Sequence, residues 1–241
     1  MKIIGVIPAR YGSTRFPGKP LVNLCGKPLL QWVVEGARKS RHLSEIIVAT
    51  DDRRIYELAD KIGVAAAMTS SDCATGTDRI FQATRDMDFD VVINVQGDEP
   101  LIDQSYIDPL AGAFIENPYL NMATLGHPLE QADIENKNAV KVITNSAGEA
   151  LYFSRFPIPF SRVDFKPGNR AALKHIGLYG YTKDFLQTFC SSAPCELEKL
   201  ESLEQLRALY LGAKIKVLEV QKPTYGVDTP EDLKRLEGLL K

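Results

Sequence analysis

Short apolar runs rich in β-branched residues alternate with amphipathic helical patterns along the first half of the chain. Runs of this kind, without polar alternation, are typical of strands that are buried on both faces of a parallel sheet. We predict strands at Ile3–Pro8, Glu45–Thr50, Val64–Ala67 and Asp90–Val95, and helices at Pro28–Ser40, Asp52–Ile62 and Thr77–Asp86. The alternation favours an α/β fold with a mostly parallel central sheet and helices on both faces, whose ligands bind beyond the carboxyl ends of the strands.

After about residue 120 the pattern changes, because strand-like segments follow one another with few helices between them. The predicted strands are Met122–Leu125, Ala139–Thr144, Ala150–Arg155 and Ile176–Tyr181, followed by helices at Lys183–Phe189 and Ser202–Leu211, a strand at Lys214–Val220 and a helix at Thr229–Leu240. No segment has the composition of a linker between domains. We therefore predict a single domain over residues 1–241, with an antiparallel-rich insertion at about 120–185.

The charge balance argues against a protein that coats nucleic acid. The 241 residues include 29 Lys and Arg and 31 Asp and Glu, for a formal net charge of -2. Nucleic-acid binding needs a strong basic excess, whereas a small anionic ligand needs only a few cations placed together. The question is therefore where the positive charge lies.

The chain carries no recognisable export or membrane signal. Its first residues are apolar only as far as Ala9 and then reach Arg10, and no run approaches the roughly 18 apolar residues of a membrane span. The four cysteines are scattered, and the three histidines lie far apart in the sequence. We expect a reduced cytoplasmic protein without membrane insertion and without a zinc site.

The loop after the first strand has the composition of a phosphate-binding loop. It contains Gly12 and Gly18, the hydroxyl residues Ser13 and Thr14, the cations Arg10, Arg15 and Lys19, and no acid. Glycines let backbone N–H groups approach an anion, and the cations neutralise it. A solvated basic loop is the alternative. The loop matches neither the P-loop nor the dinucleotide fingerprint, which disfavours kinase and dehydrogenase functions.

Acids follow two of the predicted strands. Asp98 and Glu99 come directly after the strand that ends at Val95, and Asp228 follows the last strand. Mg²⁺ binds one or two carboxylates together with water and phosphate oxygens. Asp98 is the better candidate because Gly97 permits close approach, whereas Asp228 could instead cap the last helix.

Six segments together resemble the 3-deoxy-manno-octulosonate cytidylyltransferase family. They are the first loop, the turn at Asp98, Tyr152–Arg155, His175–Tyr181, Leu203–Arg207 and Gly226–Leu233, in that order. The resemblance implies a nucleotide-diphospho-sugar transferase-like fold. It also implies a Mg²⁺-dependent reaction of CTP with 3-deoxy-D-manno-octulosonate (Kdo), which gives CMP-Kdo and pyrophosphate for lipopolysaccharide synthesis, and a homodimer formed through the antiparallel-rich region.

The resemblance also implies roles for individual residues. Arg10, Ser13 and Lys19 correspond to triphosphate-binding positions, and Arg15 lies beside them and is expected to join them; Asp98 and Asp228 correspond to the Mg²⁺ ligands, and Thr77, Asp78 and Arg79 to the cytosine-binding loop. Gln96 lies near nucleotide and sugar, and Arg155, His175, Tyr179, Glu204 and Gln205 correspond to the sugar pocket. Arg10, Lys19 and Asp98 act most directly on the reacting phosphate. Each sugar-pocket residue also has a purely structural alternative.

The mechanism implied is in-line attack of the C2 hydroxyl of Kdo on the α-phosphorus of CTP. Metal activation of that hydroxyl is favoured over His175 as a general base. Two rival functions remain: a cytidylyltransferase for 8-amino-Kdo or sialic acid, and a catalytically inactive nucleotide-binding module. The presence of Arg10, Lys19, Asp98 and Asp228 disfavours the inactive module.

Overall fold

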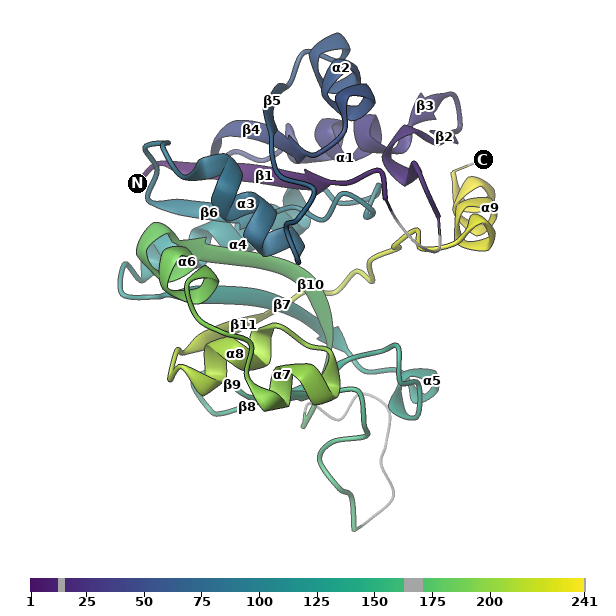
Figure 1. Ribbon diagram of the computed structural model, residues 1–241. Helices are drawn as coiled ribbons and strands as arrows, with labels where there is room; N and C mark the ends of the chain where they lie inside the picture. The colour runs from purple at the N-terminus through teal and green to yellow at the C-terminus, as the bar shows by residue number, and fades with distance from the viewer. Residues whose placement is uncertain (13–15, 163–170, 241) are drawn as a thin grey trace. The chain divides into compact units, whose positions relative to one another are not determined.

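The computed structural model describes residues 1–12, 16–162 and 171–240 (Figure 1). The chain forms two compact units, one made of residues 1–112 together with the segment from Thr224 onward, and the other of residues 113–223. We refer to them as the first and the second unit. The single functional domain predicted over 1–241 stays a prediction.

The first unit is built on four parallel strands in the order β6-β1-β4-β5. Their bounds are β1, Ile3–Ala9; β4, Leu43–Thr50; β5, Ala65–Met68; and β6, Val91–Asn94. In the register of the sheet, Val6 of β1 lies between Ile47 of β4 and Asn94 of β6. Asn94 and the residues Ile3, Ile4, Val6, Ile7 and Ala9 of β1 are at most 3% exposed, which explains why these strands are continuous apolar runs.

Three helices connect these strands: α1 (Leu29–Ala37), α2 (Arg53–Lys61) and α3 (Gly76–Thr84). The chain passes from β1 through β4 to β5 in one direction and then returns through α3 to β6, on the other side of β1. Since parallel crossovers are right-handed, α1 and α2 cover one face and α3 the other, where Figure 1 shows it in front of the strands. The strand order thus reverses between β1 and β6.

The second unit is mostly antiparallel, as predicted. Its strands are β7 (Met122–Pro128), β8 (Lys141–Thr144), β9 (Ala150–Ser154), β10 (Leu173–Thr182) and β11 (Ile215–Glu219). β10 pairs antiparallel with β7 and β8, β8 pairs antiparallel with β9, and β11 pairs parallel with β7. The helices are α5 (Gln131–Ile134), α6 (Lys183–Cys190), α7 (Glu196–Glu201) and α8 (Gln205–Tyr210).

Several helices differ from the sequence prediction, and the short helices α5 and α7 were not predicted. Helix α4 (Gln104–Glu116) was not predicted, because Pro109 interrupts its pattern. The helix predicted over Ser202–Leu211 begins later, since Ser202 has a left-handed backbone (φ 51°) and ends α7 instead.

The remaining elements of the first unit are short, apart from the last helix. They are the turn η1 (Lys19–Leu21), the hairpin of β2 (Asn23–Leu24) and β3 (Lys27–Pro28), and α9 (Pro230–Leu239). None of the helices in the described part of the chain has the length and apolarity of a membrane span.

We predict opposite effects for two glycine-to-alanine substitutions in helices. A Cβ atom on Gly36 of α1 would lie 1.9 Å from the carbonyl oxygen of Ile102, so Gly36→Ala should lower the free energy of unfolding by about 2–3 kcal/mol. A Cβ atom on Gly112 of α4 would meet nothing within 4 Å, so Gly112→Ala should raise it by about 0.5–1 kcal/mol. Urea denaturation measures both, and equal effects at the two sites would contradict the packing argument.

Candidate functional site

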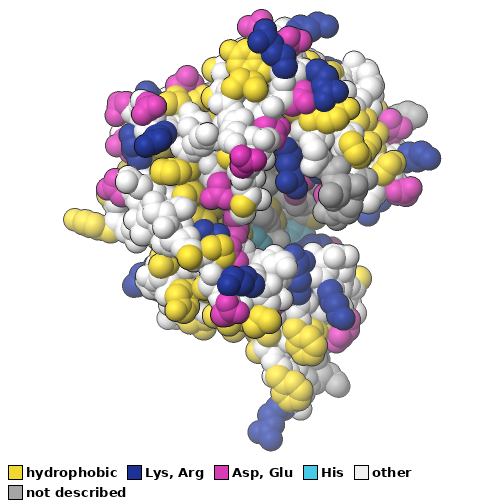
Figure 2. Space-filling model, in the orientation of Figure 1, with side chains coloured by type: hydrophobic (Ala, Val, Ile, Leu, Met, Phe, Trp, Pro, Cys, Tyr) yellow, Lys and Arg dark blue, Asp and Glu magenta, His cyan; other side chains and the backbone are white. Residues whose placement is uncertain are grey.

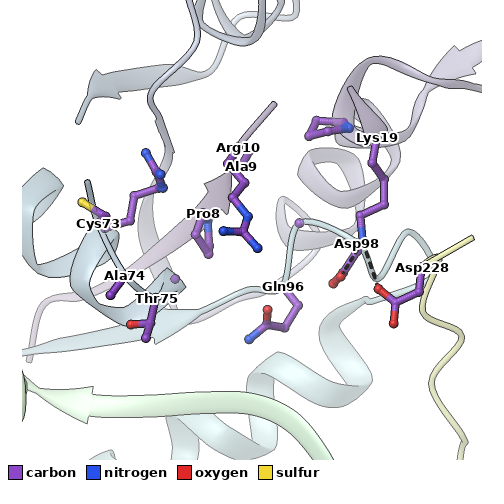
Figure 3. A pocket seen from close by; sticks show the side chains of 14 residues that line it. Pro8, Ala9, Arg10, Lys19, Cys73, Ala74, Thr75, Gln96, Asp98 and Asp228 are labelled. Atoms are coloured by element: carbon purple, nitrogen blue, oxygen red, sulfur yellow. Dashed lines mark hydrogen bonds and ion pairs between the residues drawn. The ribbon is translucent and has the colours of Figure 1, made fainter. Parts of the chain in front are cut away.

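A cavity of about 260 Å³ opens at the carboxyl ends of β1 and β6, where the strand order reverses. In α/β sheets this reversal is where ligands bind, because the loops of the two strands diverge there. The lining comes from the loop after β1, the segment before α3, the turn after β6 and the segment before α9 (Figure 3). It consists of Pro8–Arg10, Lys19, Pro20, Cys73–Gly76, Arg79, Gln96–Asp98 and Asp228.

The turn after β6 packs its backbone against the end of β1. A Cβ atom on Gly97 would lie 2.6 Å from the carbonyl oxygen of Pro8, so a residue with a side chain would force the two segments apart. Val95 also donates its backbone N–H to the carbonyl of Val6 (2.9 Å). The close approach expected of Gly97 therefore serves to place Asp98 beside the end of β1.

Lys19 joins the two predicted metal ligands. Its Nζ lies 2.8 Å from Oδ2 of Asp98 and 3.3 Å from Oδ1 of Asp228 (Figure 3). The lysine side chain is 13% exposed, whereas those of Asp98 and Asp228 are 35% and 48% exposed. Three segments that are far apart in the sequence thus converge on one ammonium group.

Asp228 is not the residue that caps the last helix. Thr229 is the N-cap of α9: its hydroxyl accepts from the N–H of Asp232, whose carboxylate in turn accepts from the N–H of Thr229. Asp232 also accepts from the N–H of Asp228 (3.1 Å). The capping alternative for Asp228 is therefore wrong, and its carboxylate turns toward Lys19 instead.

The described residues fit a magnesium ion. Two carboxylates, those of Asp98 and Asp228, contact one cationic nitrogen, which shows that they jointly attract positive charge. Mg²⁺ takes one or two carboxylates and completes its shell with water and phosphate oxygens. Within the described part of the chain, no three His, Cys, Asp or Glu side chains converge as a metal cage would require. This donor set suits Mg²⁺ shared with a ligand.

Glu99 follows Asp98 in the turn after β6 and was not chosen as a site residue from the sequence. Burial raises the pKa of its carboxyl to about 7, with a further contribution from the neighbouring Asp98 carboxylate, although the Thr224 hydroxyl and the Tyr225 N–H hydrogen-bond to it. Val227 donates its N–H to the carbonyl of Asp98 (2.9 Å). The turn after β6 therefore holds the segment that leads to Asp228. The position of Glu99 next to Asp98 was the one sequence feature that pointed to Glu99.

Of the four residues predicted to bind the triphosphate, Arg10 and Lys19 lie within the described part of the chain. Arg10 is exposed and lines the cavity, where Figure 3 shows its side chain between the Cys73–Thr75 segment and the two aspartates. Gln96 lines the same cavity. Ser13 and Arg15 lie outside the described residues.

The predicted cytosine-binding residues all have local structural contacts. Thr77 is fully buried, and Asp78 completes a capping box with Thr75 at the start of α3. Arg79 is 3% exposed and donates to Asp51 (2.8 Å) and to the Thr69 hydroxyl, which ties α3 to the ends of β4 and β5. Of these three predicted residues Arg79 alone lines the cavity. Their contact with a base stays a prediction.

His175 and Tyr179 lie side by side on β10 in the second unit. Their ring centroids are 5.3 Å apart, and Phe153 packs edge-on against His175. The Thr124 hydroxyl lies 3.0 Å from Nε2 of His175. Burial lowers the pKa of His175 to about 3 and raises that of Tyr179 well above its usual range. A neutral histidine of this kind is a weak proton acceptor, which disfavours His175 as general base.

Arg155, Glu204 and Gln205 also belong to the second unit. The Arg155 guanidinium donates to the backbone carbonyls of Lys137, Glu201 and Ser202. Gln205 is 3% exposed, and its Nε2 has no hydrogen-bond partner within the described residues. A buried amide donor without a partner is costly, so the ligand-binding role expected of Gln205 has a physical basis.

The fold and the site define a class of protein. A parallel sheet with a cationic loop and a pair of carboxylates at its switch point is the arrangement of a nucleotide-binding transferase of the α/β class. The family described as "Cytidylyltransferase" matches residues 4–215, and the chain belongs to it.

Relatives that resemble the chain over its whole length make the assignment finer. A protein of Bdellovibrio bacteriovorus named 3-deoxy-manno-octulosonate cytidylyltransferase is 57% identical over 100% of this chain and 98% of its own length. One of the same name from Trichlorobacter lovleyi is 46% identical over 100% and 99% of the two chains. The family resemblance read from the sequence is thereby confirmed.

Solved structures agree with this assignment. CMP:2-keto-3-deoxy-manno-octonic acid synthetase complexed with CTP superposes with a TM-score of 0.94 at 41% identity, over 100% of this chain and 98% of the other. The 4-diphosphocytidyl-2C-methyl-D-erythritol synthase of Anaerococcus prevotii, at 14% identity and a TM-score of 0.65, shares the fold over 99% and 98% of the chains. The predicted fold class is confirmed.

We predict that His175 stays neutral across the physiological pH range. Its folded-state pKa of about 3 lies below the ordinary value of 6.5 because burial disfavours the charged form, so this group leaves the free energy of unfolding unchanged above pH 6.5 and lowers it by about 1.4 kcal/mol per pH unit between pH 6.5 and pH 3. Its imidazole NMR signals, assigned by comparison with His175→Gln, should not move between about pH 8 and about pH 5. A normal titration near pH 6.5 would refute the assignment.

Proposed function

We propose that this protein transfers the cytidylyl group of CTP to Kdo, giving CMP-Kdo and pyrophosphate for lipopolysaccharide synthesis. The observation that carries the proposal is the convergence of Lys19, Asp98 and Asp228 at the switch point of the sheet. It occurs in a chain that is 57% identical, over its full length, to a relative named for this activity. The structure that superposes with a TM-score of 0.94 contains CTP and is named for the same sugar acid.

In this proposal, residues of the first unit bind the triphosphate and stabilise its reaction. Arg10 and Lys19 offer positive charge to the triphosphate, and Ser13 and Arg15 join them in this proposal. Negative charge develops on the phosphate oxygens during in-line displacement. Fixed cations of this kind therefore stabilise the transition state more strongly than the ground state. Asp98 and Asp228 would hold Mg²⁺, which when bound supplies further positive charge at the reacting phosphate. The C2 hydroxyl of Kdo is the nucleophile, and pyrophosphate leaves.

Recognition of the two substrates is assigned to different parts of the chain. Thr77, Asp78 and Arg79 bind the cytosine side, and Gln96 lies near nucleotide and sugar. Arg155, His175, Tyr179, Glu204 and Gln205 of the second unit recognise the sugar acid. The buried, unpartnered Nε2 of Gln205 supports this part of the proposal, since a sugar hydroxyl or carboxylate would satisfy it.

We also propose that the protein is a homodimer. Phe156 and Phe160, which follow β9, are 70% and 88% exposed and lie beside an apolar cavity of about 420 Å³ lined also by Ile134 and Ile158. Figure 2 shows hydrophobic side chains at the bottom of the view. Exposed aromatic groups of this size are typical of surfaces that are covered by a partner.

Because the reaction consumes CTP, we place the enzyme in the cytoplasm.

A pyrophosphate-release assay tests the proposed reaction. We expect release with CTP, Mg²⁺ and Kdo, and little with UTP or ATP in place of CTP. Sialic acid and 8-amino-Kdo serve as competing acceptors. A preference for either of them over Kdo, or equal rates with all nucleotides, would refute the proposal.

Replacing Asp98 should abolish turnover without unfolding the protein. Asp98→Ala removes one of the two carboxylates that are proposed to hold Mg²⁺ and that contact the Lys19 ammonium. We therefore expect a loss of at least about 100-fold in kcat at saturating Mg²⁺. An unchanged circular dichroism spectrum is the control for folding. Near-normal turnover would remove Asp98 from the metal site.

Replacing Lys19 should affect one substrate much more than the other. Lys19→Ala removes a cation from the phosphate side of the cavity, so the KM for CTP should rise by about tenfold or more while the KM for Kdo changes little. Steady-state kinetics with each substrate varied in turn measures the split. The reverse pattern would contradict the triphosphate assignment.

A further inference from the structure

The end of β9 and the turn between α7 and α8 hold each other through reciprocal hydrogen bonds. The Glu201 carboxylate accepts from the Ser154 hydroxyl (2.6 Å) and from the backbone N–H of Arg155 (2.9 Å). In return, Nε of Arg155 donates to the backbone carbonyl of Glu201 (2.8 Å). Each residue thus fixes the backbone of the other, although 46 positions separate them in the chain.

The Arg155 guanidinium extends this contact to neighbouring backbone groups. Nη2 donates to the carbonyl of Ser202 (3.3 Å) and Nη1 to that of Lys137 (3.2 Å). Ser202 has a φ of 51°, a left-handed conformation that a residue with a side chain rarely adopts. Such a conformation persists where surrounding contacts hold it, and here Arg155 binds the backbone carbonyls on both sides of the Ser202 Cα, those of Glu201 and Ser202.

Lys141 fixes the Arg155 backbone from the other side. The residue is fully buried, and its Nζ donates to the carbonyls of Asn136, Ala139 and Arg155, each at 2.8 Å. The position of Arg155 is therefore determined by Lys141 at its carbonyl and by Glu201 at its N–H. An arginine held in this way is a rigid support for the turn that it contacts.

This turn leads directly into the residues assigned to the sugar acid. Leu203 is 6% exposed and donates its N–H to the carbonyl of Glu198 (3.1 Å), which anchors the turn to α7. Glu204 is the N-cap of α8, and Gln205 is its first residue. A shift of the turn would therefore move both Glu204 and Gln205.

We propose that Glu201 and Arg155 form a positioning clamp that sets the start of α8 for binding of the sugar acid. The inference rests on the proposed function, and it deepens that function by adding Glu201, which no sequence pattern singled out. It also gives Arg155 a role that its charge alone does not provide. Glu201 acts through the turn and does not itself touch the sugar.

The test combines two conservative substitutions with a matched control. Glu201→Gln keeps the size of the side chain but replaces one acceptor oxygen by a donor, and Arg155→Lys keeps the charge but loses the fork that reaches several carbonyls. Glu196→Gln removes an acid from the same helix, one whose side chain is 80% exposed. These variants and the Glu201→Gln/Arg155→Lys double variant are compared with the unaltered protein.

We expect Glu201→Gln and Arg155→Lys each to raise the KM for Kdo by about tenfold, with the KM for CTP within about twofold of the unaltered value. The KM of the double variant for Kdo should be no higher than that of the more strongly affected single variant, because both substitutions disrupt the same clamp. Hydrogen–deuterium exchange at the amides of residues 203–207 should become faster in each. Glu196→Gln should behave as the unaltered protein.

Other results would overturn the inference. If Arg155→Lys raises the KM for Kdo and Glu201→Gln leaves it unchanged, Arg155 acts on the sugar independently of Glu201 and there is no clamp. If both variants lower only the melting temperature, the contacts are structural. If the unaltered protein does not use Kdo, the proposed function fails, while the exchange measurement still tests whether Glu201 and Arg155 hold the turn.

Discussion

The contact between the end of β1 and the turn after β6 is the constraint on which the site depends. The sheet order reverses between these two strands, so their loops leave in opposite directions and open a cavity. At the same point the backbones touch, because Gly97 has no Cβ atom to keep the Pro8 carbonyl away. The reversal of strand order therefore opens the cavity, and the backbone contact brings the Asp98 carboxylate to its edge.

Charge organises the rest of this site. Lys19, Asp98 and Asp228 come from three segments of the first unit and meet at one ammonium nitrogen. A net charge of -2 for the whole chain conceals this arrangement, because cations and carboxylates that lie together in the cavity cancel in the sum. Glu99 lies next to Asp98, and burial together with the Asp98 carboxylate raises its pKa to about 7. Opposite charges held in one partly buried place suit the transfer of a charged phosphate group.

In the proposed function, the second unit recognises the sugar acid through buried polar groups. His175 is neutral there, since burial lowers its pKa to about 3, so hydrogen bonding and ring packing describe it better than proton transfer does. Arg155 offers the clearest contrast with its expected role. An arginine in a sugar pocket is expected to meet the sugar carboxylate, yet this one donates to three backbone carbonyls. Its rigid fork is well suited to hold a turn in an unusual conformation.

The sequence alone determined the parallel sheet, the antiparallel-rich region, the cationic loop and the acids after two strands, because hydrophobic periodicity and local composition are properties of short segments. It missed α4, whose Pro109 breaks the helical pattern, and it placed the start of α8 too early, because the left-handed backbone of Ser202 depends on contacts from β9. The sequence also left open whether Asp228 caps a helix or faces the cavity. Only the tertiary structure decided this, as it decided the partners of Lys19, Glu99 and Arg155. Those choices depend on distances between residues far apart in the chain, which no local pattern contains.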